Sequence, residues 1–158
     1  MTLNKIKSYA KVNLALNIIG KTKKLHRIES LISFINLYDL ILIKKIKSKN
    51  HSIIFKGKFS KNIKSNNTVF RLLQILDEKK LISEKFYIKV IKNIPQKAGL
   101  GGGSMNAASV LNYLIKKKNI NPNHKKIRSI CDLIGSDVIL GTIASSCVLS
   151  SNGRIKKI

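Results

Sequence analysis

Residues 95–108 read Pro-Gln-Lys-Ala-Gly-Leu-Gly-Gly-Gly-Ser-Met-Asn-Ala-Ala, and glycine fills four of the five positions from 99 to 103. Before this stretch, apolar and other residues alternate over positions 86–90, as they do in a β-strand. After it, the apolar residues of positions 107–115 follow the spacing of one face of an α-helix. The stretch therefore predicts a strand, a glycine loop and a helix, in that order.

A loop of this kind favours the binding of a phosphate group. Glycine lets the backbone approach a ligand with no Cβ in the way. The helix that follows offers unpaired N–H groups and the positive end of its dipole. No Lys-Ser or Lys-Thr pair follows the last glycine, which excludes a Walker loop, and the glycine spacing differs from the dinucleotide fingerprint. A glycine-rich turn before a helix can also serve packing alone, so both interpretations stay open at this point.

Length and charge limit the kind of protein. The chain has 158 residues, which suggests one domain with a sizeable core. Its formal net charge of +24 would ordinarily suggest a nucleic acid or an anionic membrane as partner. Lysine, isoleucine and asparagine are abundant throughout, however, while arginine and aromatic residues are scarce, which is typical of an AT-rich coding sequence. We therefore expect no specific nucleic-acid partner.

Cysteine usage and hydropathy suggest a location. Cys131 and Cys147 lack the spacing of a metal site, and no secretory segment opens the chain, so we expect a reducing, cytoplasmic environment. No apolar run reaches the roughly 18 residues of a membrane span, so we expect no membrane partner. We expect no metal site built from protein ligands alone. The sequence does not indicate an oligomeric state.

Residue periodicity predicts an α+β domain with a mixed sheet. Asn67 should cap one helix, a second should run from the glycine loop to about residue 118, and a third should start with Asn121 as its N-cap and Pro122 as its first residue and stop at Gly135. The expected strands cover residues 5–19, 28–38, 40–46, 52–56, 86–91, 147–149 and 154–158, with turns at 20–24 and 150–153.

The glycine stretch resembles the second motif of the GHMP kinases, Pro-x-x-x-Gly-Leu-Gly-x-Gly-Ser-x-Asn-Ala. Residues 8–14, Ser-Tyr-Ala-Lys-Val-Asn-Leu, are similar to the opening Pro-Ala-Lys-Ile-Asn-Leu of that family. Three more blocks resemble family motifs in the family's order: Leu-Tyr-Asp at 37–39, Asn-Asn-Thr-Val at 66–69 and Gly-Ser-Asp-Val at 135–138. Each block is weak alone, but their combination is specific.

The resemblance implies a fold and an activity. The fold would be the GHMP kinase N-terminal domain, a mixed sheet with helices like the second domain of ribosomal protein S5. Residues 1–158 would be that ATP-binding domain, with the C-terminal GHMP domain absent and little activity expected from this part alone. The blocks are most similar to those of kinases that use ATP to phosphorylate the 2-hydroxyl of 4-diphosphocytidyl-2-C-methyl-D-erythritol, in the non-mevalonate route to isoprenoid precursors.

The resemblance also assigns catalytic roles. It makes Asp137 the base that accepts the proton of the substrate hydroxyl and Lys11 its cationic partner. Phosphoryl transfer asks little covalent chemistry of a protein, so positioning and charge neutralisation should dominate. For the pair to act together, the first strand must lie beside the turn after Gly135. Without the resemblance, Lys11 would be a surface lysine on an edge strand, and Asp137 a helix-capping or turn carboxylate.

ATP is implied to bind the glycine stretch, with Asn67 and Lys92 near its base and sugar. Mg²⁺ is expected with ATP, and the sequence does not indicate its ligands. The residues of the stretch implied to contact ATP are Pro95, Gln96, Lys97, Ala98, Gly99, Leu100, Gly101, Gly102, Gly103 and Ser104.

The second implied partner is a cytidine-diphosphate-linked sugar alcohol. Asn13 is implied to orient its hydroxyl end, unless it is simply an amide at a sheet edge. His26 is implied to hydrogen-bond cytosine, although a histidine in a polar turn is otherwise merely solvated. Leu25 stands where the family has a tyrosine that stacks on the base, and an aliphatic side chain can pack there without aromatic stacking.

Two other functions stay open. Leu25 leaves room for a GHMP-type kinase that acts on another small alcohol. The expected fold is also shared with RNA-associated proteins, so a basic RNA-binding module is the second alternative. Electrostatic RNA binding should weaken steeply with salt, whereas nucleotide binding at the glycine loop should weaken only moderately.

Overall fold

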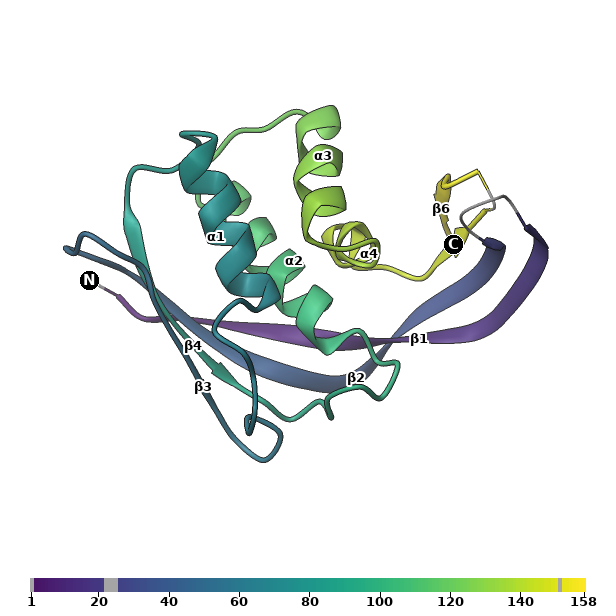
Figure 1. Ribbon diagram of the computed structural model, residues 1–158, viewed down its shortest axis with the longest axis horizontal. Helices are drawn as coiled ribbons and strands as arrows, with labels where there is room; N and C mark the ends of the chain where they lie inside the picture. Colours follow the sequence, from purple (N-terminus) through teal and green to yellow (C-terminus); the bar gives the residue numbers. More distant parts are fainter. Residues whose placement is uncertain (1, 22–25, 151) are drawn as a thin grey trace.

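The computed structural model describes residues 2–21, 26–150 and 152–158. The strands form one mixed sheet, and α1 to α4 lie together on one side of it (Figure 1), which confirms the expected α+β class. The strands are β1 (Asn4–Lys21), β2 (His26–Ile46), β3 (Ser52–Lys56), β4 (Lys85–Ile91), β5 (Cys147–Leu149) and β6 (Ile155–Lys157). The helices are α1 (Thr68–Glu78), α2 (Gly102–Lys116), α3 (His124–Ile134) and α4 (Val138–Ile143).

A long antiparallel pair, β1 and β2, organises the sheet. The sequence predicts separate strands at 28–38 and 40–46, but they form one strand. Tyr9 pairs with Tyr38 and Ala10 with Ile35, so β2 carries a bulge at residues 36–37. A bulge interrupts the alternation of side chains without ending the strand, which explains why the pattern suggests two strands.

Of the predicted turn at 20–24, Gly20 and Lys21 belong to β1, and residues 22–24 lie outside the described part of the chain.

The opposite edge of β2 holds two strands at its two ends. Leu40 to Ile46 pair with β4, and Ser30 to Ile32 pair with β5, which continues to β6. Strand β3 pairs parallel with β4, and α1 is the crossover that a parallel pair requires. This order brings the end of β4, and with it the glycine loop, beside the middle of β1 and β2. None of the described helices is long and apolar enough to cross a bilayer.

The helix ends test the capping predictions. Asn67 caps α1 as expected, because its Oδ1 accepts the N–H groups of Val69 and Phe70. The predicted start of α3 is wrong by two residues: Asn123 is the N-cap and His124 the first helical residue. Asparagines lie on both sides of Pro122, and the second one accepts the N–H of Lys126 at 2.9 Å. The short helix α4 was not expected, because its six residues show too little periodicity to be recognised.

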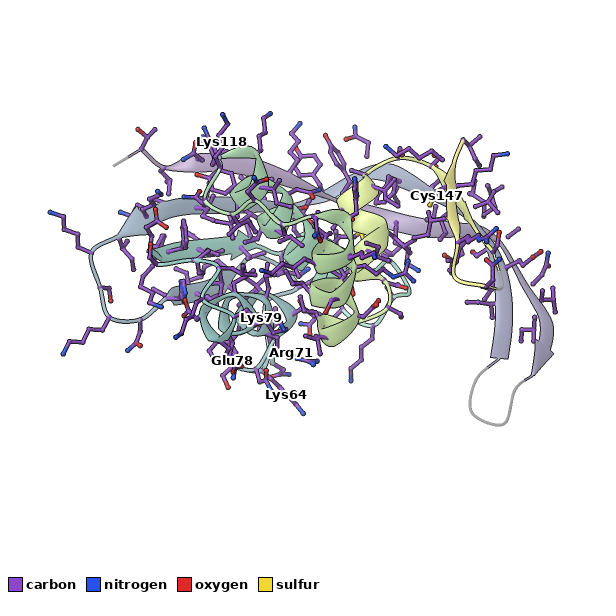
Figure 2. The ribbon with its side chains drawn as sticks, turned by 90° about the horizontal axis from the view of Figure 1, so that it is seen from above. Lys64, Arg71, Glu78, Lys79, Lys118 and Cys147 are labelled. Atoms are coloured by element: carbon purple, nitrogen blue, oxygen red, sulfur yellow. The ribbon has the colours of Figure 1, made fainter. Side chains whose placement is uncertain are left out.

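Two groups of buried side chains hold the helices to the sheet. The larger core lies between the sheet and α1, α2 and α3, and Cys131 belongs to it. The smaller core consists of Ile32, Met105, Leu140 and Cys147, where β2 and β5 meet α2 and α4. Figure 2 shows Cys147, the first residue of β5, far along the sheet from the Glu78 and Lys79 end of α1. Burial raises the pKa of the Cys131 thiol to about 11 and also raises the pKa of Cys147.

His51 connects α1 to the sheet. Its Nδ1 accepts the N–H of Phe86 at 3.0 Å, and its Nε2 lies 3.1 Å from Oδ2 of Asp77, which also accepts a hydrogen bond from Lys85. The neutral ring with hydrogen on Nε2 satisfies both contacts. Burial lowers the pKa of His51, although Asp77 opposes this effect.

We expect the His51 contribution to make the fold less stable in mild acid. Because its pKa is lower in the folded chain than the roughly 6.5 of an unfolded chain, its full contribution is present above pH 6.5 and is lost as the pH falls below that value. Urea unfolding at pH 7.5 and pH 5.5 should show a larger loss of unfolding free energy in the wild type than in His51→Gln. Equal losses in the two proteins would contradict this assignment.

Candidate functional site

A cavity of about 650 Å³ opens at the N-terminus of α2. Its walls come from β1, from the start of α1, from the end of β4, from the glycine loop and from the turn before α4. The lining includes every predicted ATP-binding residue, together with Lys11, Asn13 and Asp137. Blocks that lie far apart in the sequence therefore meet around one space.

The glycine loop is fixed against β1. The backbone N–H of Lys11 donates to the carbonyl of Leu100 at 3.1 Å. Gly101, the N-cap of α2, has a φ of 66°, in the left-handed region that favours glycine. A Cβ there would lie 2.9 Å from Cγ of Lys11. Both the backbone conformation and the close approach of Lys11 thus require glycine at this position.

Lys11 and Asp137 form an ion pair inside the cavity. Lys11 Nζ lies 3.1 Å from Asp137 Oδ2 and donates to Asn13 Oδ1 at 3.2 Å. The Lys11 side chain is 8% exposed, so it is not the surface lysine of the alternative interpretation, whereas Asp137 is 38% exposed and reachable from the cavity. The first strand thus lies beside the turn after Gly135, as joint action of the pair requires.

The position of Asp137 tests the other alternative, that of a capping carboxylate. Asp137 immediately precedes α4, but its side chain makes no capping hydrogen bond. Its ionic partner within the described residues is Lys11. The carboxylate is therefore directed to the cavity contact and does not complete the helix.

The opposite wall is the start of α1. The Asn67 side chain is engaged within the protein, since it caps α1 and also donates to the carbonyls of Lys64 and Ser65. Thr68 Oγ1 donates to the carbonyl of Gly103 at 2.6 Å and so ties α1 to the first turn of α2. This contact of Thr68 was not predicted from the sequence.

Behind the glycine loop lies a second ion pair that sequence reasoning missed. Lys92 donates to Oδ2 of Asp39, and Asn106 donates to the same oxygen at 3.0 Å. Asp39 directly precedes the apolar run at residues 40–43 of β2, and this position of a carboxylate was the available signal. Lys92, predicted only as a contact for ATP, also has this structural partner.

The predicted base-binding pair is not tested. Leu25 and the His26 side chain lie outside the described residues. The His26 backbone pairs with Lys21, the last residue of β1.

The chain matches known proteins in sequence over nearly its whole length. Residues 67–147 match the family model described as "GHMP kinases N terminal domain". A 4-diphosphocytidyl-2-C-methyl-D-erythritol kinase from Pelagibacter ubique (strain HTCC1062) is 61% identical over 154 residues, which are 97% of this chain and 55% of the relative. One from Clostridium beijerinckii (strain ATCC 51743 / NCIMB 8052) is 38% identical over 135 residues, covering 85% of this chain and 48% of the relative. The chain thus spans about half the length of the curated relatives it matches.

Solved structures show the same arrangement. A crystal structure of 4-(cytidine 5'-diphospho)-2C-methyl-D-erythritol kinase superposes with a TM-score of 0.81 at 25% identity, covering 98% of this chain and 55% of that one. Mevalonate kinase from Staphylococcus aureus MRSA252 superposes with a TM-score of 0.63 at 15% identity, covering 100% of this chain and 56% of that one, and so shares the fold. The sheet topology, the glycine loop before α2 and the match over residues 67–147 lead to one conclusion: the chain belongs to the GHMP kinase family.

Proposed function

We propose that this chain is the ATP-binding half of a kinase that phosphorylates the 2-hydroxyl of 4-diphosphocytidyl-2-C-methyl-D-erythritol. The observation that carries the proposal is the cavity in which the glycine loop faces the Lys11–Asp137 pair. A phosphate site and an ionised carboxylate in one cavity are what transfer from ATP to a hydroxyl needs. Family membership favours this function over a dedicated RNA-binding module.

Each group has a distinct role in the proposed reaction. The phosphates of ATP bind at the N-terminus of α2, where glycine backbone and the helix dipole favour anions. Asp137 accepts the proton of the substrate hydroxyl while the hydroxyl oxygen attacks the γ-phosphorus of ATP, and ADP leaves. Lys11 holds that carboxylate in place, and Asn13 orients Lys11 through its amide oxygen.

Mg²⁺ binds in proteins through one or two carboxylates together with substrate phosphates. Asp137 is the acidic residue among those that line the cavity, and the described residues hold no cluster of three or more His, Cys, Asp or Glu side chains suited to a metal. This set fits a metal ion bound mainly by ATP itself. The metal ion would neutralise phosphate charge, and Asp137 is the lining residue that could contribute a carboxylate ligand.

The proposal extends to the whole protein. Residues 1–158 would form one ATP-binding domain, and a second domain, like the remaining half of the relatives, would complete the substrate site. ATP and the cytidine-linked alcohol would be its partners and the cytoplasm its location. In the pathway proposed, the product would be the 2-phosphate used to make isoprenoid precursors.

The substrate can be tested in a chimera that joins residues 1–158 to the second half of the Pelagibacter ubique relative. ADP release should depend on 4-diphosphocytidyl-2-C-methyl-D-erythritol, and cytidine diphosphate should compete and protect the region around His26 and Leu25. Turnover with mevalonate or homoserine instead would favour a kinase for another alcohol.

Gly102→Val should weaken ATP binding about tenfold or more, because overpacking at the loop displaces the backbone that faces the phosphates. A Cβ at Gly102 would lie 3.1 Å from both Cγ2 of Ile94 and Nζ of Lys92. Titration with a fluorescent ATP analogue measures the change, and circular dichroism checks that the variant folds.

Gly135→Val is the matched control for this substitution. Gly135 has a φ of 166°, which any residue adopts, and no atom lies within 4 Å of the position of its Cβ. It should bind ATP like the wild type. Unchanged ATP affinity in folded Gly102→Val would rule out the phosphate site.

A further inference from the structure

The ion pair behind the glycine loop is almost completely buried. Asp39 is 0% exposed and Lys92 4% exposed. The sequence contains only seven acidic residues against 31 lysines and arginines, so a fully buried carboxylate is an unusual use of one of them. Removing two charges from water is expensive, and replacing such a pair with apolar residues is often neutral or stabilising. Stability alone is therefore a weak reason for this pair.

The two oxygens of Asp39 hold different parts of the site. Oδ1 accepts the backbone N–H groups of Asn93 at 2.7 Å and Ile94 at 2.9 Å. Oδ2 accepts the Lys92 ammonium and the Asn106 amide. One carboxylate thus fixes the three residues that lead from β4 into the glycine loop and also the second turn of α2. These two segments directly precede and follow the glycine loop.

The Lys92 ammonium lies beside the first residue of α2, next to the place where the phosphates are proposed to bind. Lys92 lines the cavity, and its Nζ is 3.1 Å from the position that a Cβ on Gly102 would occupy. Gly102 is the first residue of α2, so the ammonium and the positive end of the helix dipole lie together. Among the described residues Lys92 Nζ donates to Asp39, and an ammonium carries three donors, so it has the capacity to donate to a ligand as well.

We propose that Asp39 is a positioning residue for ATP: it holds the Lys92 ammonium and the approach to the glycine loop so that both face the phosphates. This inference rests on the proposed function, because it concerns the same ATP site. It also moves Lys92 from the base and sugar of the nucleotide to its phosphates. Asp39 itself does not line the cavity and touches no ligand.

The test compares Asp39→Asn, Lys92→Met and the double variant. An asparagine at position 39 keeps the shape of the side chain. If its oxygen accepts the N–H groups of Asn93 and Ile94, its NH₂ group must face two other donors, those of Lys92 and Asn106. If it turns the other way, the two backbone hydrogen bonds are lost. ATP affinity should fall about tenfold to a hundredfold in each single variant, the loss expected for a hydrogen bond to a charged group. Each single variant also leaves one buried charge unpaired, so each should be less stable.

The double variant separates positioning from stability. It contains neither buried charge, so its urea midpoint should recover toward that of the wild type, while ATP affinity stays low because the ammonium is missing. In the chimera, Asp39→Asn should raise KM for ATP and leave kcat within a few-fold, since the Lys11–Asp137 pair is unchanged. A merely structural pair predicts the opposite result, in which affinity recovers together with stability.

Asp77→Asn is the matched control. Asp77 is also a partly buried carboxylate with two partners, Lys85 and His51, but it lies on α1 away from the cavity. It should lose stability and keep wild-type ATP affinity. Tripolyphosphate should compete with ATP in the wild type, and its inhibition constant should be about tenfold higher in Lys92→Met.

The outcomes distinguish the two proposals. If the wild-type chain and the chimera bind no ATP, the proposed function fails and this inference fails with it. If they bind ATP, and Asp39→Asn binds it equally well, only the positioning role is overturned. An equal inhibition constant of tripolyphosphate in wild type and Lys92→Met would likewise overturn the contact between Lys92 and phosphate.

Discussion

Turnover of the chimera should fall about 10²–10⁴-fold when Asp137 is replaced by asparagine, the contribution typical of a positioned general base. The amide has the same shape as the carboxylate but cannot take the proton of the substrate hydroxyl. ATP affinity should stay near the wild-type value, because the glycine loop is unchanged. Steady-state ADP release, with ATP binding measured separately, provides both quantities. Near-normal turnover would remove Asp137 from the mechanism.

Lys11→Met should lower turnover as well, and its loss should not add to that of Asp137→Asn. The two side chains are in contact at 3.1 Å, and residues that act as a unit show non-additive effects. Asp132→Asn is the control, since Asp132 is an exposed acid paired with Arg128 on the surface of α3. Its turnover should equal that of the wild type. Fully additive losses would show that Lys11 and Asp137 act independently.

Gly141→Ala should reduce the free energy of unfolding by about 2 kcal/mol, within the usual range for overpacking. A Cβ at Gly141 would lie 2.5 Å from Cβ of Ala108 and 3.0 Å from Sδ of Met105, so α4 must move away from α2. The sign of this change in unfolding free energy is informative, because replacing glycine with alanine normally stabilises a helix by about 1 kcal/mol. Urea unfolding measures the change.

Gly135→Ala is the matched substitution at an open position, and its unfolding free energy should differ little from that of the wild type. In the chimera, Gly141→Ala should also lower turnover, since α4 begins directly after Asp137. A more stable Gly141→Ala would mean that α2 and α4 are not in close contact.

Periodicity predicted most of the strands and the three longer helices, because each has a continuous apolar face that its neighbours bury. The errors occur where a local signal is ambiguous or incomplete. Residues 36–37 bulge out of β2, so one strand appeared as two. Asn121 and Asn123 are equally good caps by residue type, and only the folded chain selects Asn123. Helix α4 is held by its contact with α2, a long-range cause that no short window contains.

The site was predictable where residue types and backbone geometry coincide. The glycine loop was recognisable because positive φ and close approach leave few alternatives to glycine. Lys11 and Asp137 were paired only through the family resemblance, because 126 positions of chain separate them and spacing carries no information at that distance. Asp39 had a sequence signal, a carboxylate directly before the apolar run at 40–43, but the two segments that it contacts, residues 92–94 and α2, converge only in the folded chain.

The chain contains two cysteines, and each lies in a different core. The thiolate is the nucleophile that attacks thiol reagents, and burial with a raised pKa makes both side chains unreactive until their surroundings open. Labelling at Cys131 therefore reports openings of the helix-covered centre, whereas labelling at Cys147 reports openings around β5 and α4. Peptide mass spectrometry of the unmodified chain can follow the two rates separately. The two labelling rates thus measure how independently the two cores open.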